Sequence, residues 1–167
     1  VAAGYKDITL LGQNVNSYGK DLDQGVDFAD LLAKIASLPG DFLIRFMTSH
    51  PKDASKKLFD TMAQSRHVAH QLHLPVQSGN SRVLKEMNRG YTREQYLELV
   101  RKLRAAVPDI AISTDIIVGF PGETEEEFEE TLRFSEAVGF ARMHVFPFSP
   151  HETTPAAVMP DQIAENV

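Results

Sequence analysis

Polar side chains recur at even spacing within four segments that otherwise have the apolar composition of buried strands. The pairs are Thr9 and Gln13, Arg45 and Ser49, His73 and Gln77, and Ser113 and Asp115. Because side chains alternate between the two faces of a strand, each pair lies on one face. Most of these residues fall near carboxyl ends of strands, where α/β proteins bind ligands, so the set predicts a wet cavity for a polar ligand. The alternative is that they cap or turn the strand ends.

The residue types and their spacing disfavour a metal site and a catalytic nucleophile. The chain has no cysteine, which excludes disulfides, thiolate metal sites and a cysteine nucleophile supplied by this chain. His67, His70 and His73 are three residues apart, but His73 falls in the next predicted strand, which disfavours a zinc site. Solvated or capping histidines are the favoured interpretation. Ser49 and His50 are adjacent and cannot face each other as nucleophile and base.

A glycine-containing loop, Gly119 to Thr124, lies between the most apolar predicted strand and the best predicted helix. Its glycines permit a tight turn and a close approach of backbone to a ligand. It is neither a G-x-G-x-x-G motif nor a P-loop, and the acidic residues after it disfavour phosphate. A ligand-binding loop and a plain structural turn both remain open.

Charge is clustered along the chain, although the net charge is only −6. Six glutamates lie at the end of the glycine loop and after it, and are interpreted as a solvated helix face: Glu123, Glu125, Glu126, Glu127, Glu129 and Glu130. A basic stretch between residues 80 and 105 either follows a phosphate backbone or forms an ordinary mixed-charge helix surface. It contains Arg82, Lys85, Arg89, Arg93, Arg101, Lys102 and Arg104.

The elements that must position these residues alternate between strand and helix. Strands are predicted at Ile8–Leu11, Asp41–Thr48, Gln71–Val76, Ile110–Val118 and Arg142–Phe148. Helices are predicted at Phe28–Leu38, from Asn80 to Met87, from Thr92 to Val107 and from Thr124 to Val138. A further helix is predicted to begin after Asp53, which would be its N-cap. This alternation predicts parallel strands with helical crossovers. Five strands are too few for a closed eight-stranded barrel, and a doubly wound sheet is the alternative.

Length and composition predict one globular domain. The 167 residues are 43% apolar and 24% charged, which excludes wholesale disorder. No apolar run approaches the ~18 residues of a membrane span, and Val1–Asp7 is not a signal peptide. Because the first residue is not Met, we expect a piece of a longer protein.

Five motifs, in this order, resemble those of the radical-SAM methylthiotransferases, most closely the branch that modifies tRNA. They run from Leu10 to Gly19 (LLGQNVNSYG), Arg45 to Pro51 (RFMTSHP), His73 to Gly79 (HLPVQSG), Met87 to Thr92 (MNRGYT) and Asp115 to Thr124 (DIIVGFPGET). The resemblance covers nearly the whole chain. One departure lies near the end, where the family has Arg and Gly in place of His151 and Thr153.

The resemblance implies an α/β fold, a parallel (β/α) partial TIM-type barrel. About five strands are expected, with the first strand of the six-stranded radical-SAM core missing. Residues 1–150 are expected to form this partial core, and residues 151–167 to begin a linker toward a C-terminal TRAM domain. The implied cofactors are S-adenosylmethionine and two [4Fe–4S] clusters. Since the chain has no cysteine, the cluster ligands must lie outside it.

The resemblance also assigns cofactor contacts to the polar face. Gln13 is expected near the methionine end of S-adenosylmethionine, Gln77 and Ser78 near its ribose or carboxylate, and Ser113 and Asp115 at the ribose hydroxyls. Gly119 is expected near adenine, with Phe146 closing over it. The complete set of expected cofactor-binding residues is Gln13, Ser49, Gln77, Ser78, Ser113, Asp115, Gly119 and Phe146. No catalytic acid or base and no metal ligand is assigned.

The implied function is methylthiolation of C2 of N6-isopentenyladenosine beside the tRNA anticodon by a cytoplasmic transferase, with this chain inactive alone. Two alternatives remain: a methylthiotransferase acting on a ribosomal-protein aspartate, and a cluster-free domain that only binds nucleic acid or protein. The expected partners are tRNA and S-adenosylmethionine, with no membrane. Without a preceding strand, the edge at Ile8–Leu11 is expected to promote self-association.

Overall fold

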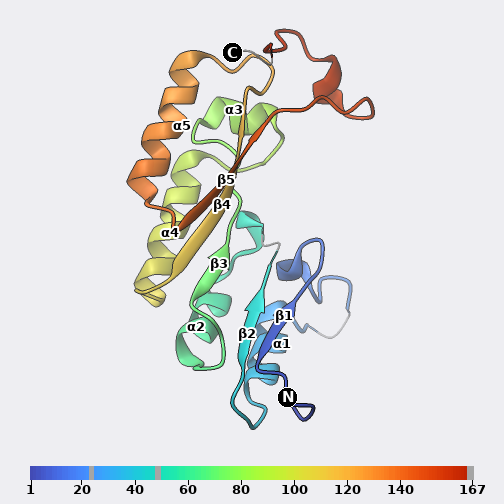
Figure 1. The fold of residues 1–167 in the computed structure, drawn as a ribbon, viewed down its shortest axis with the longest axis vertical. Coiled ribbons are helices and arrows are strands. Elements are labelled where there is room, and N and C mark those ends of the chain that lie inside the picture. The colour runs from blue at the N-terminus through green and yellow to red at the C-terminus, as the bar shows by residue number, and fades with distance from the viewer. Residues whose placement is uncertain (23–24, 48–49, 165–167) are drawn as a thin grey trace. The chain divides into compact units, whose positions relative to one another are not determined.

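The computed structural model describes residues 1–22, 25–47 and 50–164, in which one or two α-helices lie between successive strands (Figure 1). The strands are β1 (Asp7–Leu10), β2 (Leu43–Phe46), β3 (Gln71–His73), β4 (Ala111–Val118) and β5 (Arg142–Pro147). The α-helices are α1 (Phe28–Ala36), α2 (Lys56–Gln64), α3 (Ser81–Glu86), α4 (Arg93–Ala106) and α5 (Glu125–Val138). Short 3₁₀ helices cover Val15–Ser17, Pro51–Asp53 and Pro155–Val158. The predicted order of strands and helices is confirmed.

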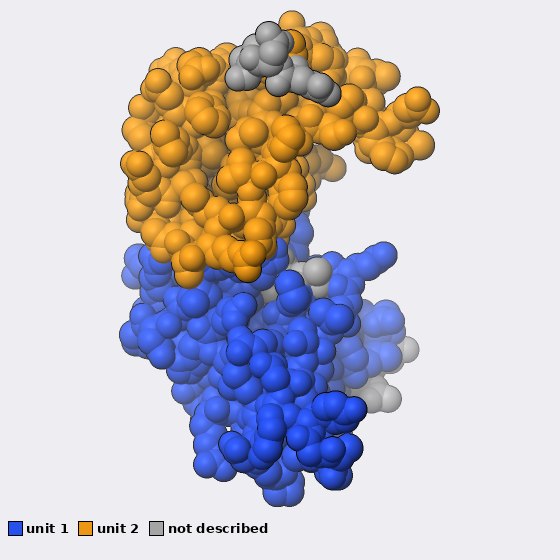
Figure 2. Space-filling model, viewed as in Figure 1, with its two compact units in different colours: residues 1–74, 99–113 blue, residues 75–98, 114–167 orange. Residues whose placement is uncertain are grey.

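The chain divides into two compact units (Figure 2). Unit 1 contains Val1–Leu74 and Leu99–Ser113, and unit 2 contains Pro75–Glu98 and Thr114–Val167. Both α4 and β4 run from one unit into the other, so each unit is built from segments distant in sequence.

Unit 1 contains both parallel strand pairs whose registers are defined. β1 pairs with β2 from Asp7 opposite Leu43 to Leu10 opposite Phe46, and β3 pairs with the start of β4. Helices α1 and α2 bury their apolar faces, as their helical spacing predicts. Side chains that are at most 2% exposed form the core: Leu32, Ile44, Leu58, Met62, Leu72 and Leu103.

Unit 2 packs α5 and the start of α4 around an aromatic core. The ring of Tyr96 lies 5.9 Å from that of Phe134 and 6.3 Å from that of Phe140, as measured between centroids. β5 lies beside β4 in the sheet, and the Phe148 amide donates to the Val118 carbonyl at 2.8 Å. Unit 2 also contains both of the loops that follow Val76 and Val118.

Local capping signals set most helix starts. Asp27, Asn80 and Thr124 each accept backbone hydrogen bonds as N-caps of α1, α3 and α5, as the sequence predicts. The prediction that Asp53 caps the next helix is wrong, because Asp53 ends a 3₁₀ turn and the Ser55 hydroxyl caps α2 instead. The Asp53 carboxylate instead accepts hydrogen bonds from the Lys20 ammonium group and from the Asn14 side-chain amide.

Close packing of Gly79 against α5 fixes the loop after β3. A Cβ at this position would lie 2.7 Å from the Thr131 Cα and 2.7 Å from the Phe134 Cβ, where no side chain fits. The Gly79 amide donates to the Thr131 hydroxyl at 3.0 Å. Separately, none of the helices described for this chain is long and apolar enough to cross a membrane.

We predict that Gly79→Ala lowers the free energy of unfolding of the 167-residue chain by about 1–3 kcal/mol, because the added methyl group overpacks the contact with α5. Urea unfolding followed by circular dichroism measures the change. Gly12→Ala is the matched control, since a Cβ there meets only ordinary contacts of 3.4 Å or more. Equal effects of the two substitutions would contradict the close packing described.

Candidate functional site

From Ala111 to Ile117, side chains of β4 alternate between the core and a more open face. Ile112, Thr114 and Ile116 are buried, whereas Ser113 and Asp115 are half-buried on the other face. The polar residues predicted to share one face of this strand therefore do so, and that face is not packed into the core.

Strand register in unit 1 brings predicted polar residues side by side. Thr9 lies opposite Arg45, and His73 lies opposite Ser113. The His73 Nδ1 and the Ser113 hydroxyl are 3.0 Å apart and hydrogen-bonded. Ser113, one of the expected cofactor-binding residues, is thus linked to a neighbour from the same predicted set.

Arg45 is engaged by its own strand neighbours. Its Nε donates to both Asp7 carboxylate oxygens, at 3.2 and 3.0 Å, and its Nη1 donates to Gln71 at 2.6 Å. These three side chains form a charged hydrogen-bonded chain across β1, β2 and β3. Arg45 therefore serves to join the strands of unit 1.

In unit 2, Asp115 is paired with a histidine that the sequence reasoning missed. The His144 Nδ1 lies 3.1 Å from the Asp115 Oδ1, and both side chains are partly exposed. The Phe146 ring, on the same face of β5 as His144, is 6.4 Å from the imidazole and half exposed. The spacing of His144 and Phe146 on one strand face was the available signal.

The loop after β3 places Gln77 in a strained conformation beside β4. Gln77 has φ +76°, its amide donates to the Asp115 carbonyl, and its carbonyl accepts from the Ile117 amide, both at 2.9 Å. A non-glycine residue in this region is uncommon and is kept only where its surroundings hold it. Ser78, by contrast, is 0% exposed, with its hydroxyl 3.3 Å from that of Thr131. A ligand contact through the Ser78 hydroxyl would require rearrangement of this buried junction.

The glycine loop is closed by Glu123. Its Oε2 accepts from the Gly119 amide at 2.7 Å and from the Phe120 amide at 3.3 Å. Gly119 itself has φ +74° and open space at its Cβ position, so a flat ligand can approach its backbone. Burial raises the pKa of the Glu123 carboxyl above its usual range, although the two amide hydrogen bonds act in the opposite direction.

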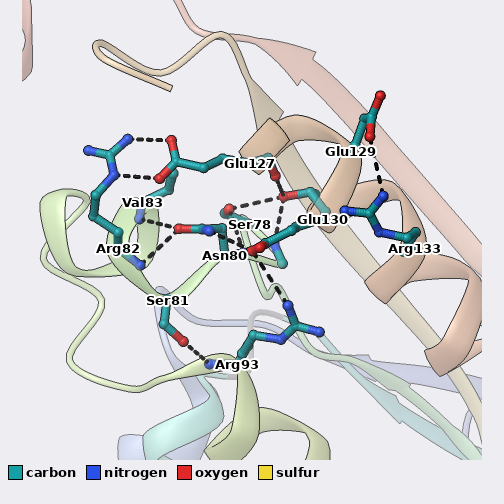
Figure 3. A network of polar contacts seen from close by, with 12 residues as sticks. Ser78, Asn80, Ser81, Arg82, Val83, Arg93, Glu127, Glu129, Glu130 and Arg133 are labelled. Carbon is teal, nitrogen blue, oxygen red and sulfur yellow. Dashed lines mark hydrogen bonds and ion pairs between the residues drawn. The ribbon is translucent and has the colours of Figure 1, made fainter. Parts of the chain in front are cut away.

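The glutamate cluster is only partly the solvated helix face that we predict from sequence. Glu125 and Glu126 are exposed, but Glu123 is 9% exposed, and its Oε1 has no hydrogen-bond partner among the described residues. Glu127 pairs with Arg82, and Glu130 accepts from the Asn80 side chain at 2.7 Å (Figure 3). The hydrogen bonds from Arg82 hold the pKa of Glu127 below its usual range.

Two cations of the basic stretch are engaged by side chains of α5. Arg82 pairs with Glu127, and the Arg93 Nη1 lies 3.6 Å from Glu130 while its guanidinium stacks 5.7 Å above the Phe134 ring. These two cations are neutralised by α5, which favours the mixed-charge helix surface over a continuous phosphate-binding stretch.

Gln13 and Ser49, two of the expected cofactor-binding residues, are not among the residues described for unit 2. Gln13 is exposed in the segment that follows β1, in unit 1. Ser49 lies outside the residues that the structure describes. Of the expected set, unit 2 thus contains Gln77, Ser78, Asp115, Gly119 and Phe146, and unit 1 contains Gln13 and Ser113.

We predict that Glu123→Gln changes the pH dependence of stability. Because the folded-state pKa of Glu123 is raised, its favourable contribution is complete below the pKa of the unfolded chain and is lost as pH rises through the folded-state value. The free energy of unfolding of E123Q should therefore increase relative to that of the wild type as the pH rises from about 4. Urea titrations at several pH values measure this.

Glu126→Gln provides the matched control, because Glu126 is an exposed glutamate in the first turn of α5. E126Q should not reproduce the increase in stability relative to the wild type that E123Q shows, because it removes no buried carboxyl. If E123Q behaved in the same way as E126Q, the buried carboxyl would have no role in the pH dependence.

Sequence similarity to known proteins extends over 98–100% of the chain. A protein named tRNA-2-methylthio-N(6)-dimethylallyladenosine synthase from Thermoanaerobacter sp. (strain X514) is 57% identical over 164 residues, covering 98% of this chain and 35% of that protein. Proteins of the same name from Carboxydothermus hydrogenoformans and Clostridium perfringens (strain SM101 / Type A) are 53% and 52% identical over all of this chain, and 38% and 37% of theirs. The chain therefore spans little more than a third of these curated relatives.

Solved structures show the same fold at low sequence identity. Coproporphyrinogen III oxidase from Escherichia coli, described as a radical SAM enzyme, matches with a TM-score of 0.65 and 21% identity over 83% of this chain and 33% of that one. Methylornithine synthase matches with a TM-score of 0.59 and 17% identity over 93% of this chain and 42% of that one. The predicted α/β fold, a partial TIM-type barrel of the radical-SAM kind, is confirmed. The chain belongs to the Radical SAM superfamily, whose family model it matches over residues 1–135 of 167.

Proposed function

We propose that this chain is the S-adenosylmethionine-binding part of an enzyme that methylthiolates C2 of N6-isopentenyladenosine in tRNA. The observation that carries the proposal is the 52–57% identity to synthases of that name over 98–100% of the chain. Superfamily membership alone would leave the substrate open, because one fold serves many reactions. Identity at this level over nearly the whole chain favours the same substrate.

The residues of the chain fit one of the two implied cofactors and not the other. With no cysteine, the chain offers no thiolate to a [4Fe–4S] cluster, so the cluster ligands must come from outside it. For S-adenosylmethionine, unit 2 offers the Asp115 carboxylate and the open backbone at Gly119. When bound at a cluster, this cofactor supplies radical chemistry that activates a C–H bond.

The protein's own contribution is binding and orientation. In our proposal Asp115, held by His144, accepts hydrogen bonds from the ribose hydroxyls. Gly119 allows the adenine ring to lie against the backbone, and the half-exposed ring of Phe146 covers it. Glu123 keeps the Gly119 loop closed through two amide hydrogen bonds. None of these groups is assigned a proton-transfer role.

The remaining organisation follows the same proposal. Residues 1–150 are the partial core, and residues 151–167 begin a linker toward a TRAM domain. The start of this linker is folded back, since the Asp161 carbonyl accepts from the Gly122 amide at 2.9 Å. The partners are tRNA and S-adenosylmethionine in the cytoplasm. β1, an end strand of its two-stranded sheet, offers an edge for self-association of the isolated chain.

We predict that this chain can replace the matching segment of a functional relative. In a chimera, it substitutes for the aligned 164 residues of the Thermoanaerobacter synthase, which keeps the rest of its own chain. Expressed in a strain that lacks the modification, the chimera should restore 2-methylthio-N6-isopentenyladenosine, measured by mass spectrometry of digested tRNA. The 167-residue chain alone should restore none, because it cannot hold a cluster.

Two outcomes would contradict the proposal. A folded chimera that has the iron and sulfide content of the relative but leaves tRNA unmodified would show that the chain serves another substrate. A mass shift of a ribosomal protein in that strain would identify the rival reaction. For the chain alone, 5′-deoxyadenosine above a no-protein control, after anaerobic incubation with S-adenosylmethionine and dithionite, would contradict its expected inactivity.

A further inference from the structure

Arg82 connects the two loops of unit 2 that carry expected cofactor contacts. From the second residue of α3, its Nε and Nη2 donate to the two carboxylate oxygens of Glu127, each at 2.5 Å (Figure 3). The same Nη2 donates to the Gly122 carbonyl at 2.6 Å. One side chain thus joins the segment after Gln77 to the loop after Gly119.

Both ends of this connection are fixed. Glu127 also accepts from the Thr124 amide at 3.0 Å, as the third residue of the α5 capping box. On the other side, the Asn80 side chain caps α3 through the Arg82 and Val83 amides, at 2.9 and 3.0 Å. It also donates to Glu130 at 2.7 Å. Arg82 therefore acts between two anchored backbones.

We propose that Arg82 is a positioning residue, which sets the Gly119–Glu123 loop relative to Gln77 in the geometry that S-adenosylmethionine requires. This inference rests on the proposed function. A guanidinium is suited to the task because its planar fork reaches a carboxylate and a carbonyl together, whereas a lysine ammonium is a single point charge.

Arg82 contributes to stability as well as to position, so the two effects must be measured separately. The Arg82 side chain is 46% exposed, but the Glu127 carboxylate that it holds through two hydrogen bonds is only 13% exposed. Loss of Arg82 should therefore lower stability, because it leaves a largely buried carboxylate without its cation. A displacement of about 1 Å in a site can reduce activity about 100-fold, so cofactor use should also be impaired in the molecules that remain folded.

The test uses the cluster-loaded chimera with Arg82→Met and Arg82→Lys. The readouts are the KM for S-adenosylmethionine in 5′-deoxyadenosine formation and the urea midpoint of unfolding. R82M should raise the KM by roughly 10- to 100-fold. Its urea midpoint should also fall, because the Glu127 carboxylate loses its partner. R82K, which keeps the charge but not the fork, should give an intermediate KM.

Arg133→Met is the matched control, because Arg133 pairs with Glu129 at 3.2 Å on the exposed side of α5 (Figure 3). Within the part of the chain that the structure describes, it forms no ion pair or hydrogen bond with either loop. Its KM should equal that of the wild type. If R82M and R82K also have the wild-type KM while the chimera still modifies tRNA, positioning by Arg82 is wrong and the proposed function stands. A wild-type chimera that never cleaves S-adenosylmethionine overturns both. Should R82M fail to fold, R82K decides, and a wild-type KM there refutes the inference.

Discussion

Side-chain alternation along β4 is the constraint on which the candidate site depends. Thr114 is fully buried on the core face, where its hydroxyl accepts from the Val76 amide at 2.9 Å, so Asp115 must lie on the other face. A slip of one residue in the pairing of this strand would exchange the faces. It would bury the Asp115 carboxylate among apolar side chains, at a cost on the order of several kcal/mol. The fold therefore holds the polar face open by the same register that fills the core.

Helix α5, together with Glu123 just before its N-cap, holds the irregular loops in one conformation, which is the second requirement. Thr131 bonds the Gly79 amide and lies against Ser78, while Glu123 bonds the amides at the turn after β4. Buried polar groups left unpaired cost about 1–3 kcal/mol each, so these hydrogen bonds strongly disfavour other loop conformations. In the proposed function, the loops present backbone atoms to the cofactor, and rigid support for them is what binding requires.

Local signals account for what could be predicted from the sequence. Capping residues such as Thr124 act within one helical turn, and the parity of Ser113 and Asp115 follows from strand geometry alone. The burial of Glu123 and the pairing of Arg82 with Glu127 could not be predicted, since the second joins residues 45 positions apart. Such contacts depend on how helices pack, which charge patterns along the chain do not encode. The prediction that Asp53 caps α2 was wrong because Ser55, two residues later, is an equally good N-cap residue.

The central claim is that the polar face of β4 serves the cofactor and the opposite face serves the fold. The direct test compares Asp115→Ala with Thr114→Ala in the chimera, measuring the dissociation constant of S-adenosylmethionine and the free energy of unfolding. D115A should weaken cofactor binding about tenfold or more with little loss of stability, since a lost hydrogen bond to a charged group corresponds to ~1.5–3 kcal/mol. T114A should lose ~1–3 kcal/mol of stability and bind the cofactor normally once folded. A destabilised D115A that binds S-adenosylmethionine with unchanged affinity would contradict the account.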